Sequence, residues 1–299
     1  MTEQLGTAGW KTRQVVLSSR PLSWINTAFP FAAVYVVTTG RIDALLIVGT
    51  LFFLIPYNLL MYGINDVYDY ESDLRNPRKG GAEGALLHPA LHRTVIAAGV
   101  LSSAIVGGAM VFLAGSRHPL SWIVLSLSLF AVVAYSVRGL RFKERPILDS
   151  ITSSAHFVSP AVYGLVVAGA TINFGLLALL AAFFLWGMAS HAFGAVQDVE
   201  PDRQSGIASI ATALGAWPTV RLAITFWVLA GLLMLATPWP GPLAAVLAVP
   251  YVLAVLPFWS VGDEQSESAN RGWKRFLWLN FFTGFIATLL LIIWVRQGA

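Results

Sequence analysis

Long stretches without charged side chains are the feature that most constrains the fold of this chain. One of them runs from Phe174 to Val196 and is apolar on every side of a helix. At a rise of about 1.5 Å per residue, such a helix crosses the roughly 30 Å of a bilayer's hydrocarbon core. Of all 299 residues, 57% are hydrophobic and only 11% are charged, and the mean hydropathy is +0.70. These values are typical of a polytopic membrane protein and exclude an ordinary water-soluble globule.

The apolar segments favour helices over the strands of a barrel. Only these two structures satisfy their backbone hydrogen bonds in lipid. Barrel strands alternate apolar and polar residues, whereas the run from Leu45 to Leu60 does not. We therefore expect an all-α fold with nine transmembrane helices around a central cavity, in one membrane domain over residues 1–299. The expected segments are 22–39, 42–63, 94–114, 119–137, 147–168, 172–196, 218–237, 241–260 and 276–295.

The distribution of basic residues predicts the orientation. If the N-terminus is cytoplasmic, every Lys and Arg lies on the cytoplasmic side except Arg41, Arg117 and Arg296. The positive-inside rule then predicts a multi-pass protein of the cell membrane with its N-terminus inside and its C-terminus outside. Residues 1–20 are polar and basic, which does not resemble a cleavable signal peptide.

Composition also removes several classes of function. The chain has no cysteine, so disulfides, thiolate nucleophiles and Cys-ligated metals are excluded. The net charge is +4, and no basic run interleaves with aromatics on a soluble face, so we expect no nucleic-acid partner.

Two acidic clusters stand where apolar segments end. Together they hold seven of the fifteen acidic residues: Asp66, Asp69, Glu71 and Asp73, then Asp198, Glu200 and Asp202. If the helices continue, Asn65, Asp69 and Asp73 recur at i, i+4 and i+8 on one face, and Asp66 lies near it. Asp198 and Asp202 repeat the spacing, although Pro201 between them is expected to end or kink that helix.

Carboxylates stacked in this way repel one another unless a cation neutralises them. Oxygen ligands without His or Cys suit Mg²⁺, which takes one or two carboxylates and completes its shell with water and substrate phosphate. We expect Mg²⁺ to be bound by Asp66, Asp69, Asp73, Asp198 and Asp202. Basic residues near the clusters would balance a diphosphate: Arg75, Arg78 and Lys79 follow the first cluster, Arg203 follows the second, and Arg141 and Lys143 follow the fourth segment.

The acidic clusters are also compatible with roles outside catalysis. A single aspartate at a span end is most simply part of a solvated loop, but acidic motifs at two span ends on one side favour a site. A cation-coupled transporter would place its charges near the middle of the membrane, where the third, seventh and eighth segments have no acidic residue. A non-catalytic membrane partner would not need both motifs.

The paired motifs, Asn65-x-x-x-Asp69-x-x-x-Asp73 and Asp198-x-x-x-Asp202, resemble those of the UbiA superfamily of intramembrane prenyltransferases, and the likeness covers almost the whole chain. Arg20-Pro21, and Tyr135-Ser136 followed by Arg141-x-Lys143, are similar to family positions that approach the diphosphate. The resemblance implies a helical horseshoe around a cavity, Asp motifs that bind Mg²⁺ and diphosphate, and residues 66–93 as a candidate cytoplasmic cap. It implies catalytic roles for Asp69, Asp73, Asp198 and Asp202, and substrate contacts for the following residues: Arg20, Asn65, Arg78, Lys79, Tyr135, Arg141 and Lys143.

Within this family, three stretches are most similar to the lycopene elongases of carotenoid pathways. They are residues 19–27, residues 65–81 and residues 156–164. This likeness implies transfer of a dimethylallyl group from dimethylallyl diphosphate to the end of lycopene, with or without addition of water. A quinone precursor, chlorophyllide or another lipid is the alternative acceptor, because the family shares its core chemistry.

Some polar and aromatic residues in the spans have two interpretations. His156 and His191 could accept the final proton, but an interhelical hydrogen bond is the more ordinary role of an intramembrane histidine. The aromatic candidates for stabilising a carbocation through their ring faces could equally pack in the core. They are Tyr62, Tyr68, Tyr70 and Phe193.

Overall fold

The computed structural model of the chain describes residues 7–74, 86–115 and 118–298, and every regular element in these ranges is a helix. The chain divides into two compact units, of which the first comprises Met1–Arg141 and Ser159–Ala170 and the second Phe142–Val158 and Thr171–Ala299. The all-α prediction is confirmed. The expected single domain over residues 1–299 stays a prediction, and each unit is described by itself.

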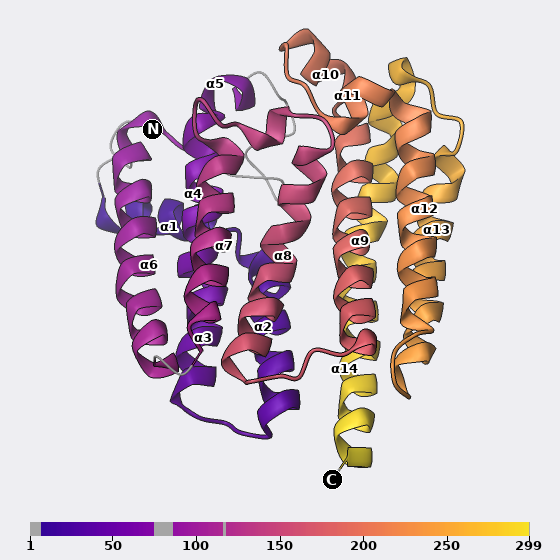
Figure 1. Cartoon of the computed structure of the whole chain (residues 1–299). Helices are drawn as coiled ribbons and strands as arrows, with labels where there is room; N and C mark the ends of the chain where they lie inside the picture. The colour runs from indigo at the N-terminus through magenta and orange to yellow at the C-terminus, as the bar shows by residue number, and fades with distance from the viewer. Residues whose placement is uncertain (1–6, 75–85, 116–117, 299) are drawn as a thin grey trace. The chain divides into compact units, whose positions relative to one another are not determined.

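The first unit holds the helices that Figure 1 labels α1 to α7, together with part of α8, and short 3-10 helices are written η. It contains α1 (Ala8–Ser18), η2 (Pro21–Ser23), α2 (Trp24–Thr39), α3 (Ala44–Leu54), α4 (Pro56–Tyr68), α5 (Tyr70–Asp73), η3 (Pro89–Leu91), α6 (His92–Ala114), α7 (Leu120–Ser136) and the C-terminal half of α8 (Leu148–Val167). α4 contacts α1, α3, α6 and α7, so it is the central helix of this unit.

A proline separates α4 from α3 within one long apolar stretch. Pro56 is the first residue of α4, and its missing N–H interrupts the helical hydrogen bonds. The carbonyl oxygens of Phe53 and Leu54 instead accept hydrogen bonds from Asn58 Nδ2 at 2.8 and 3.0 Å. Thr27 Oγ1 of α2 also donates to Phe53 O at 2.7 Å. Buried side chains thus satisfy two of the carbonyl oxygens at the break, where no water is available to do so.

Aromatic rings fix the same region from the side. Phe53 lies 5.3 Å from Phe31 of α2 and 5.4 Å from Tyr57 of α4, measured between ring centroids. Tyr163 of α8 is 5.9 Å from Phe53. Such pairs contribute about 0.5–1.5 kcal/mol each beyond their buried area. They join four helices around the start of α4.

The second unit contains the remaining helices. They are η4 (Phe142–Glu144), the N-terminal half of α8, α9 (Phe174–Val196), α10 (Val199–Gln204), α11 (Ile210–Leu214), α12 (Ala216–Met234), η5 (Gly241–Leu247), α13 (Ala248–Val255), η6 (Leu256–Phe258), η7 (Asp263–Ala269) and α14 (Asn270–Gly298). α9 and α12 pack along each other, as Figure 1 shows. Trp227 of α12 is fully buried in the core and stacks on Tyr251 with 5.6 Å between the ring centroids.

All nine expected segments fall on helices in the described part of the chain. Seven are long and apolar enough to cross a membrane: Ala8–Thr39, Ala44–Tyr68, Pro89–Ala114, Phe174–Val196, Ala216–Met234, Gly241–Phe258 and Asp263–Arg296. α7 is a shorter apolar helix. α8 covers the remaining segment with 20 residues, but its polar side chains keep it outside the group of seven.

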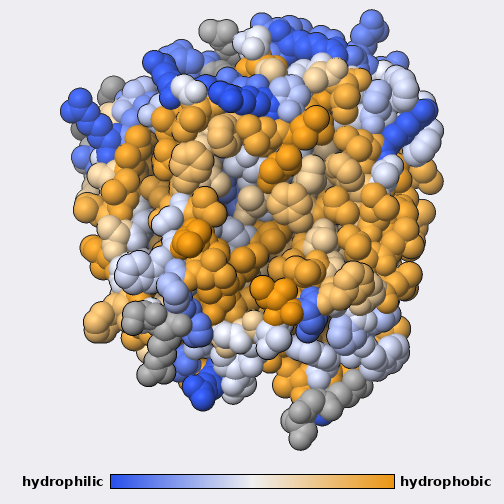
Figure 2. Space-filling view, in the orientation of Figure 1, coloured by the Kyte–Doolittle hydropathy of each residue, from blue (hydrophilic) through white to orange (hydrophobic). Residues whose placement is uncertain are grey.

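The surface fits a lipid environment. Large apolar side chains are left exposed: Phe112 of α6 and Phe174 of α9 are 84% and 75% exposed, and Ile42, just before α3, is 82% exposed. On the face drawn in Figure 2, hydrophobic residues cover the sides of the helices and hydrophilic residues gather near their ends. A water-soluble protein would not expose apolar surface on this scale.

Candidate active site

The end of α4 carries the first acidic motif. α4 ends at Tyr68, and Asp69 forms a turn before α5 begins. The helical hydrogen bonds continue, because Asp69 N–H donates to Asn65 O at 2.9 Å and Asp73 N–H donates to Asp69 O at 2.8 Å. The expected i, i+4 spacing is therefore kept across the break. Asp66, Asp69 and Asp73 are all buried, which is costly unless positive charge balances them.

Arg20 supplies one of the balancing charges. It lies between α1 and η2, and its Nη2 donates to Oδ1 of Asp66 at 3.0 Å. The same guanidinium is centred 4.4 Å from the middle of the Tyr62 ring, which adds a cation–π attraction. Arg20 also has a φ of 50°, a left-handed conformation that costs a non-glycine residue about 1–2 kcal/mol. Strain of this kind is found at functional sites that the surrounding contacts hold in place.

The end of α7 supplies the second set of contacts. Arg141 Nη2 lies 3.5 Å from Oδ1 of Asp69, and Arg141 likewise has a positive φ, of 40°. Ser136 Oγ donates to Oδ1 of Asn65 at 3.1 Å. The first unit thus brings together five of the residues that the sequence assigned to the site: Arg20, Asn65, Asp66, Asp69 and Arg141. Ser136 belongs to the Tyr135-Ser136 stretch, from which the sequence assigns only Tyr135 to the substrate. Nothing in the sequence shows which of these two adjacent side chains points at Asn65.

The second motif lies at the end of α9. Asp198 follows α9 after Gln197, and Asp202 N–H donates to Asp198 O at 2.9 Å, so the i, i+4 spacing is kept here too. The sequence predicts that Pro201 ends or kinks the helix that carries Asp198 and Asp202. Pro201 lies instead in the first turn of α10, where a missing N–H costs little because such groups have no partner within a helix. Both carboxylates are half-buried.

A group of polar contacts holds the segment after this motif. Arg203 of α10 pairs with Asp263 of η7 and donates to Thr212 O of α11 at 3.0 Å. The other oxygen of Asp263 accepts from Ala216 N–H, at the start of α12, at 2.6 Å. The sequence assigned Arg203 to the balance of a diphosphate. Its contacts in the second unit are instead those of a residue that joins α10, α11 and η7.

Asp149 is a buried residue that the sequence did not single out. Its Oδ1 accepts from Ser150 N–H and its Oδ2 from Ile210 N–H, both at 2.7 Å, so it binds the first turn of α11. Ser150 Oγ lies 3.1 Å from His191 Nδ1, which gives His191 the interhelical hydrogen bond favoured for it. The signal in the sequence that could have identified Asp149 is its position as a lone carboxylate at the start of an apolar segment. The role of His156, which is buried, stays a prediction.

The remaining predicted residues are Arg78 and Lys79, beyond the described ranges, and Tyr135 and Lys143, on described elements. Arg78 and Lys79 lie outside the described residues, as do residues 75–85 of the expected cap loop. Tyr135 of α7 is half-buried, and Lys143 lies in η4 of the second unit and is also half-buried.

The donor chemistry fits Mg²⁺. Within the described ranges, no group of three or more His, Asp or Glu side chains forms a ready metal cage. Mg²⁺ does not require one, because it is usually held by one or two carboxylates together with water and substrate phosphate. Each motif offers a pair of aspartates at i, i+4, with arginines beside the first pair. The residues therefore suit a metal that arrives with a phosphate ligand.

Comparison with known proteins gives a consistent result. The model of the UbiA prenyltransferase family matches residues 27–282. A lycopene elongase/hydratase of Corynebacterium glutamicum is 49% identical over 94% of this chain and 97% of its own length. A C(50) beta-cyclic carotenoids biosynthesis protein, LbtBC, of a Dietzia species is 49% identical over 98% of this chain and 67% of its own.

Solved structures share the fold at low identity. A UbiA homolog from Archaeoglobus fulgidus bound to GPP and Mg²⁺ has a TM-score of 0.63 and 17% identity, over 90% of this chain and 99% of its own. The same homolog bound to DMAPP and Mg²⁺ gives a TM-score of 0.61 at 17% identity, over 90% and 98%.

The capping role of Asp149 can be tested against a second capping aspartate. Asp149→Ala should lower the free energy of unfolding by about 2–3 kcal/mol, because Ile210 N–H would be left buried without a partner. Asp43→Ala removes an N-cap that accepts from Leu46 N–H at 3.0 Å and from the Tyr35 hydroxyl at 2.8 Å in a half-buried position, and should cost about 1–2 kcal/mol. Thermal unfolding in detergent measures both.

Hydrogen exchange provides the local readout of the same change. Asp149→Ala should speed exchange in residues 209–214, and Asp43→Ala should not. If Asp149→Ala had the melting temperature of the wild type and unchanged exchange in residues 209–214, the hydrogen bond between Asp149 and Ile210 would be contradicted.

Proposed function

Because the chain belongs to the UbiA prenyltransferase family, we propose that it transfers the dimethylallyl group of dimethylallyl diphosphate to an end of lycopene. The nature of the donor is supported by the geometry at the end of α4, where Asp66 and Asp69 each lie beside an arginine. The nature of the acceptor is supported by the 49% identity to lycopene elongase/hydratase over nearly the full length of both chains. Membership of an enzyme family decides against the transporter alternative.

The observation that carries the proposal is the alternation of charge in the first unit. Arg20 binds Asp66 at 3.0 Å and Arg141 lies 3.5 Å from Asp69. Carboxylates alone would attract a metal and repel a diphosphate, whereas arginines alone would bind phosphate without a metal. A metal–diphosphate complex needs both signs within a short distance, which this arrangement supplies.

The reaction that we propose is electrophilic. The bond between the allylic carbon and the diphosphate oxygen breaks, and its electron pair leaves with the diphosphate. The double bond at the end of lycopene then attacks the allylic cation and forms a carbon–carbon bond. The resulting cation loses a proton or takes up water. Both outcomes are in keeping with the double name of the relatives, elongase/hydratase.

The chain's own residues are proposed to bind, orient and shield the reactants. Mg²⁺, when bound, would neutralise the departing diphosphate. Asp69 and Asp73 of the first unit, with Asp66 in support, would bind Mg²⁺, and so would Asp198 and Asp202 of the second. Asn65, Arg20, Arg141, Tyr135 and Lys143, together with Arg78 and Lys79, would contact the diphosphate. Preorganised charge of this kind stabilises a developing anion without reorganisation at the moment of reaction.

The acceptor explains why the enzyme is embedded in lipid. Lycopene is a hydrocarbon that cannot travel through water, so it must reach the enzyme from the bilayer. An apolar environment also keeps water from quenching the allylic cation too early. The abundance of exposed apolar side chains on both units is in keeping with this route.

The proposed reaction predicts a product of defined mass. Membranes that contain the protein, labelled dimethylallyl diphosphate, lycopene and Mg²⁺ should yield lycopene that has gained one or two five-carbon units. Asp69→Asn and Asp198→Asn should each lower the rate by at least about 100-fold, because each removes a ligand charge. Glu264→Gln removes the same charge from an exposed site on η7 and should leave the rate unchanged.

Mass spectrometry of the extracted lipids measures this. Label found instead on an aromatic acid or on chlorophyllide would replace lycopene as the acceptor. Full activity of Asp69→Asn or Asp198→Asn would mean that the metal is bound elsewhere.

We also propose the orientation that the basic residues predict, with the N-terminus in the cytoplasm. The absence of cysteine makes this testable with single substitutions. A membrane-impermeant maleimide should label Arg41→Cys in intact cells and should label Glu264→Cys only in inverted vesicles. Both positions are exposed in the structure. The opposite labelling pattern would contradict the orientation.

A further inference from the structure

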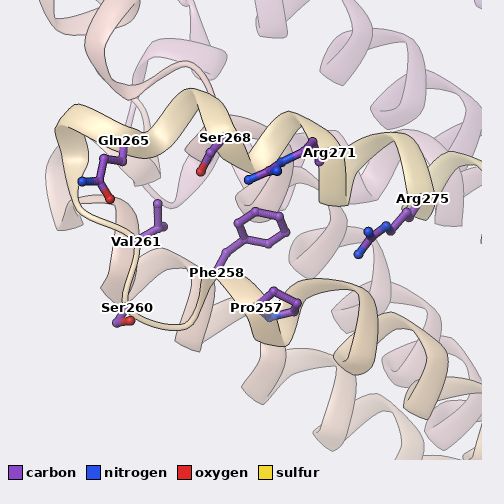
Figure 3. A pocket seen from close by; sticks show the side chains of 8 residues that line it. All are labelled: Pro257, Phe258, Ser260, Val261, Gln265, Ser268, Arg271 and Arg275. Carbon is purple, nitrogen blue, oxygen red and sulfur yellow. The ribbon is translucent and has the colours of Figure 1, made fainter.

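A polar pocket in the second unit has no part in the proposed reaction. Its volume is about 410 Å³, and it lies between η6 and the η7–α14 segment (Figure 3). Its apolar lining consists of Pro257, Phe258 and Val261. The other lining residues carry hydrogen-bonding or charged groups: Ser260, Gln265, Ser268, Arg271 and Arg275. The size suits a small polar group rather than a whole lipid or a carotenoid.

The two charged residues that line the pocket are both arginines. Arg271 and Arg275 stand one turn apart on α14; in Figure 3 the Arg275 side chain extends toward Pro257 of η6, and that of Arg271 runs back along the helix above the Phe258 ring. Neither forms an ion pair with any residue that the structure describes. On η7, Asp263 is engaged by Arg203, and Glu264 and Glu267 do not line the pocket.

Another arginine of the same unit shows the contrast. The Arg221 guanidinium lies 4.3 Å from the centre of the Trp217 ring and 4.6 Å from that of Trp259. Its Nε also donates to Trp259 O at 3.4 Å. Arg221 is thus occupied by two interfacial rings. Arg271 and Arg275 have no such partners within the described part of the chain and can bind an anion.

The helix that carries these arginines continues as an apolar, exposed face. Positions 271, 275, 278, 282 and 285 follow at helical spacing, so they lie on one side of α14. Trp278, Phe282 and Phe285 are 77%, 57% and 61% exposed. In a membrane-crossing helix such side chains face lipid tails, and the arginines at its start lie at the level of the headgroups.

We propose that this pocket binds the phosphate headgroup of an anionic phospholipid, with the acyl chains along the exposed aromatic face of α14. Two guanidinium groups one turn apart match the oxygens of a phosphodiester, and the serine and glutamine side chains supply neutral hydrogen bonds. A basic pocket at the end of membrane-crossing helices is a recognised way to select anionic lipids. The apolar continuation favours a lipid over a free phosphate, since a soluble anion would make no use of it.

Native mass spectrometry of the full chain in detergent tests the proposal. Phosphatidylglycerol and phosphatidylcholine with the same acyl chains are added in equal amounts, and the wild type should retain the first over the second. Arg275→Gln should reduce retained phosphatidylglycerol about fivefold, and Arg271→Gln together with Arg275→Gln should reduce it further. Lys274→Gln removes the same charge from a neighbouring residue that does not line the pocket, and should reduce retention clearly less than Arg275→Gln does.

Two results would overturn the proposal. Equal losses in Arg275→Gln and Lys274→Gln would show a diffuse surface charge instead of a site. Displacement of phosphatidylglycerol by millimolar inorganic diphosphate would identify a soluble phosphate as the ligand. Because the readout is lipid retention and not prenyl transfer, the outcome does not depend on the proposed reaction.

Discussion

The pairing of buried carboxylates with arginines at the end of α4 is the interaction on which the proposed site depends. Asp66 is essentially inaccessible, at 1% exposure, and Asp69 is only 9% exposed. Isolated charges at such positions would destabilise the fold by several kcal/mol. Arg20 and Arg141 offset this cost, and both do so from left-handed backbone positions. The first unit thus keeps a strained, charged arrangement where an apolar one would be simpler, which is the behaviour expected of a binding site.

The second motif is held by different means. Asp198 and Asp202 are half-buried, and the rigidity of their segment comes from its neighbours. Asp263 accepts from the start of α12 and binds Arg203, while Asp149 binds the start of α11. Gly215, which precedes α12, has a φ of 88°, and a Cβ there would lie 3.3 Å from Asp263. A side chain at this position would therefore crowd Asp263 and weaken its contacts with Arg203 of α10 and Ala216 of α12.

The sequence predicts the helices and both acidic motifs because each has a local signal, whereas Arg20 enters the prediction only through the family resemblance. Apolar length identifies spans, and i, i+4 spacing identifies carboxylates that share a helix face. It does not predict that Asp149 caps α11, since Asp149 and Ile210 are far apart in the chain and only packing brings them together. It also assigns Arg203 to a diphosphate by proximity, although Asp263 and Thr212 take up its guanidinium. Contacts between distant segments are the part that local patterns cannot specify.

We propose that the acidic motifs and their arginines bind a diphosphate through Mg²⁺. The most direct measurement is calorimetric titration of the purified protein with an unreactive thio analogue of dimethylallyl diphosphate, in the presence and absence of Mg²⁺. We expect Mg²⁺ to tighten binding by at least about tenfold, which corresponds to about 1.4 kcal/mol. Equal affinity with and without Mg²⁺ would contradict binding of the diphosphate through the metal, because the arginines alone would then bind the donor.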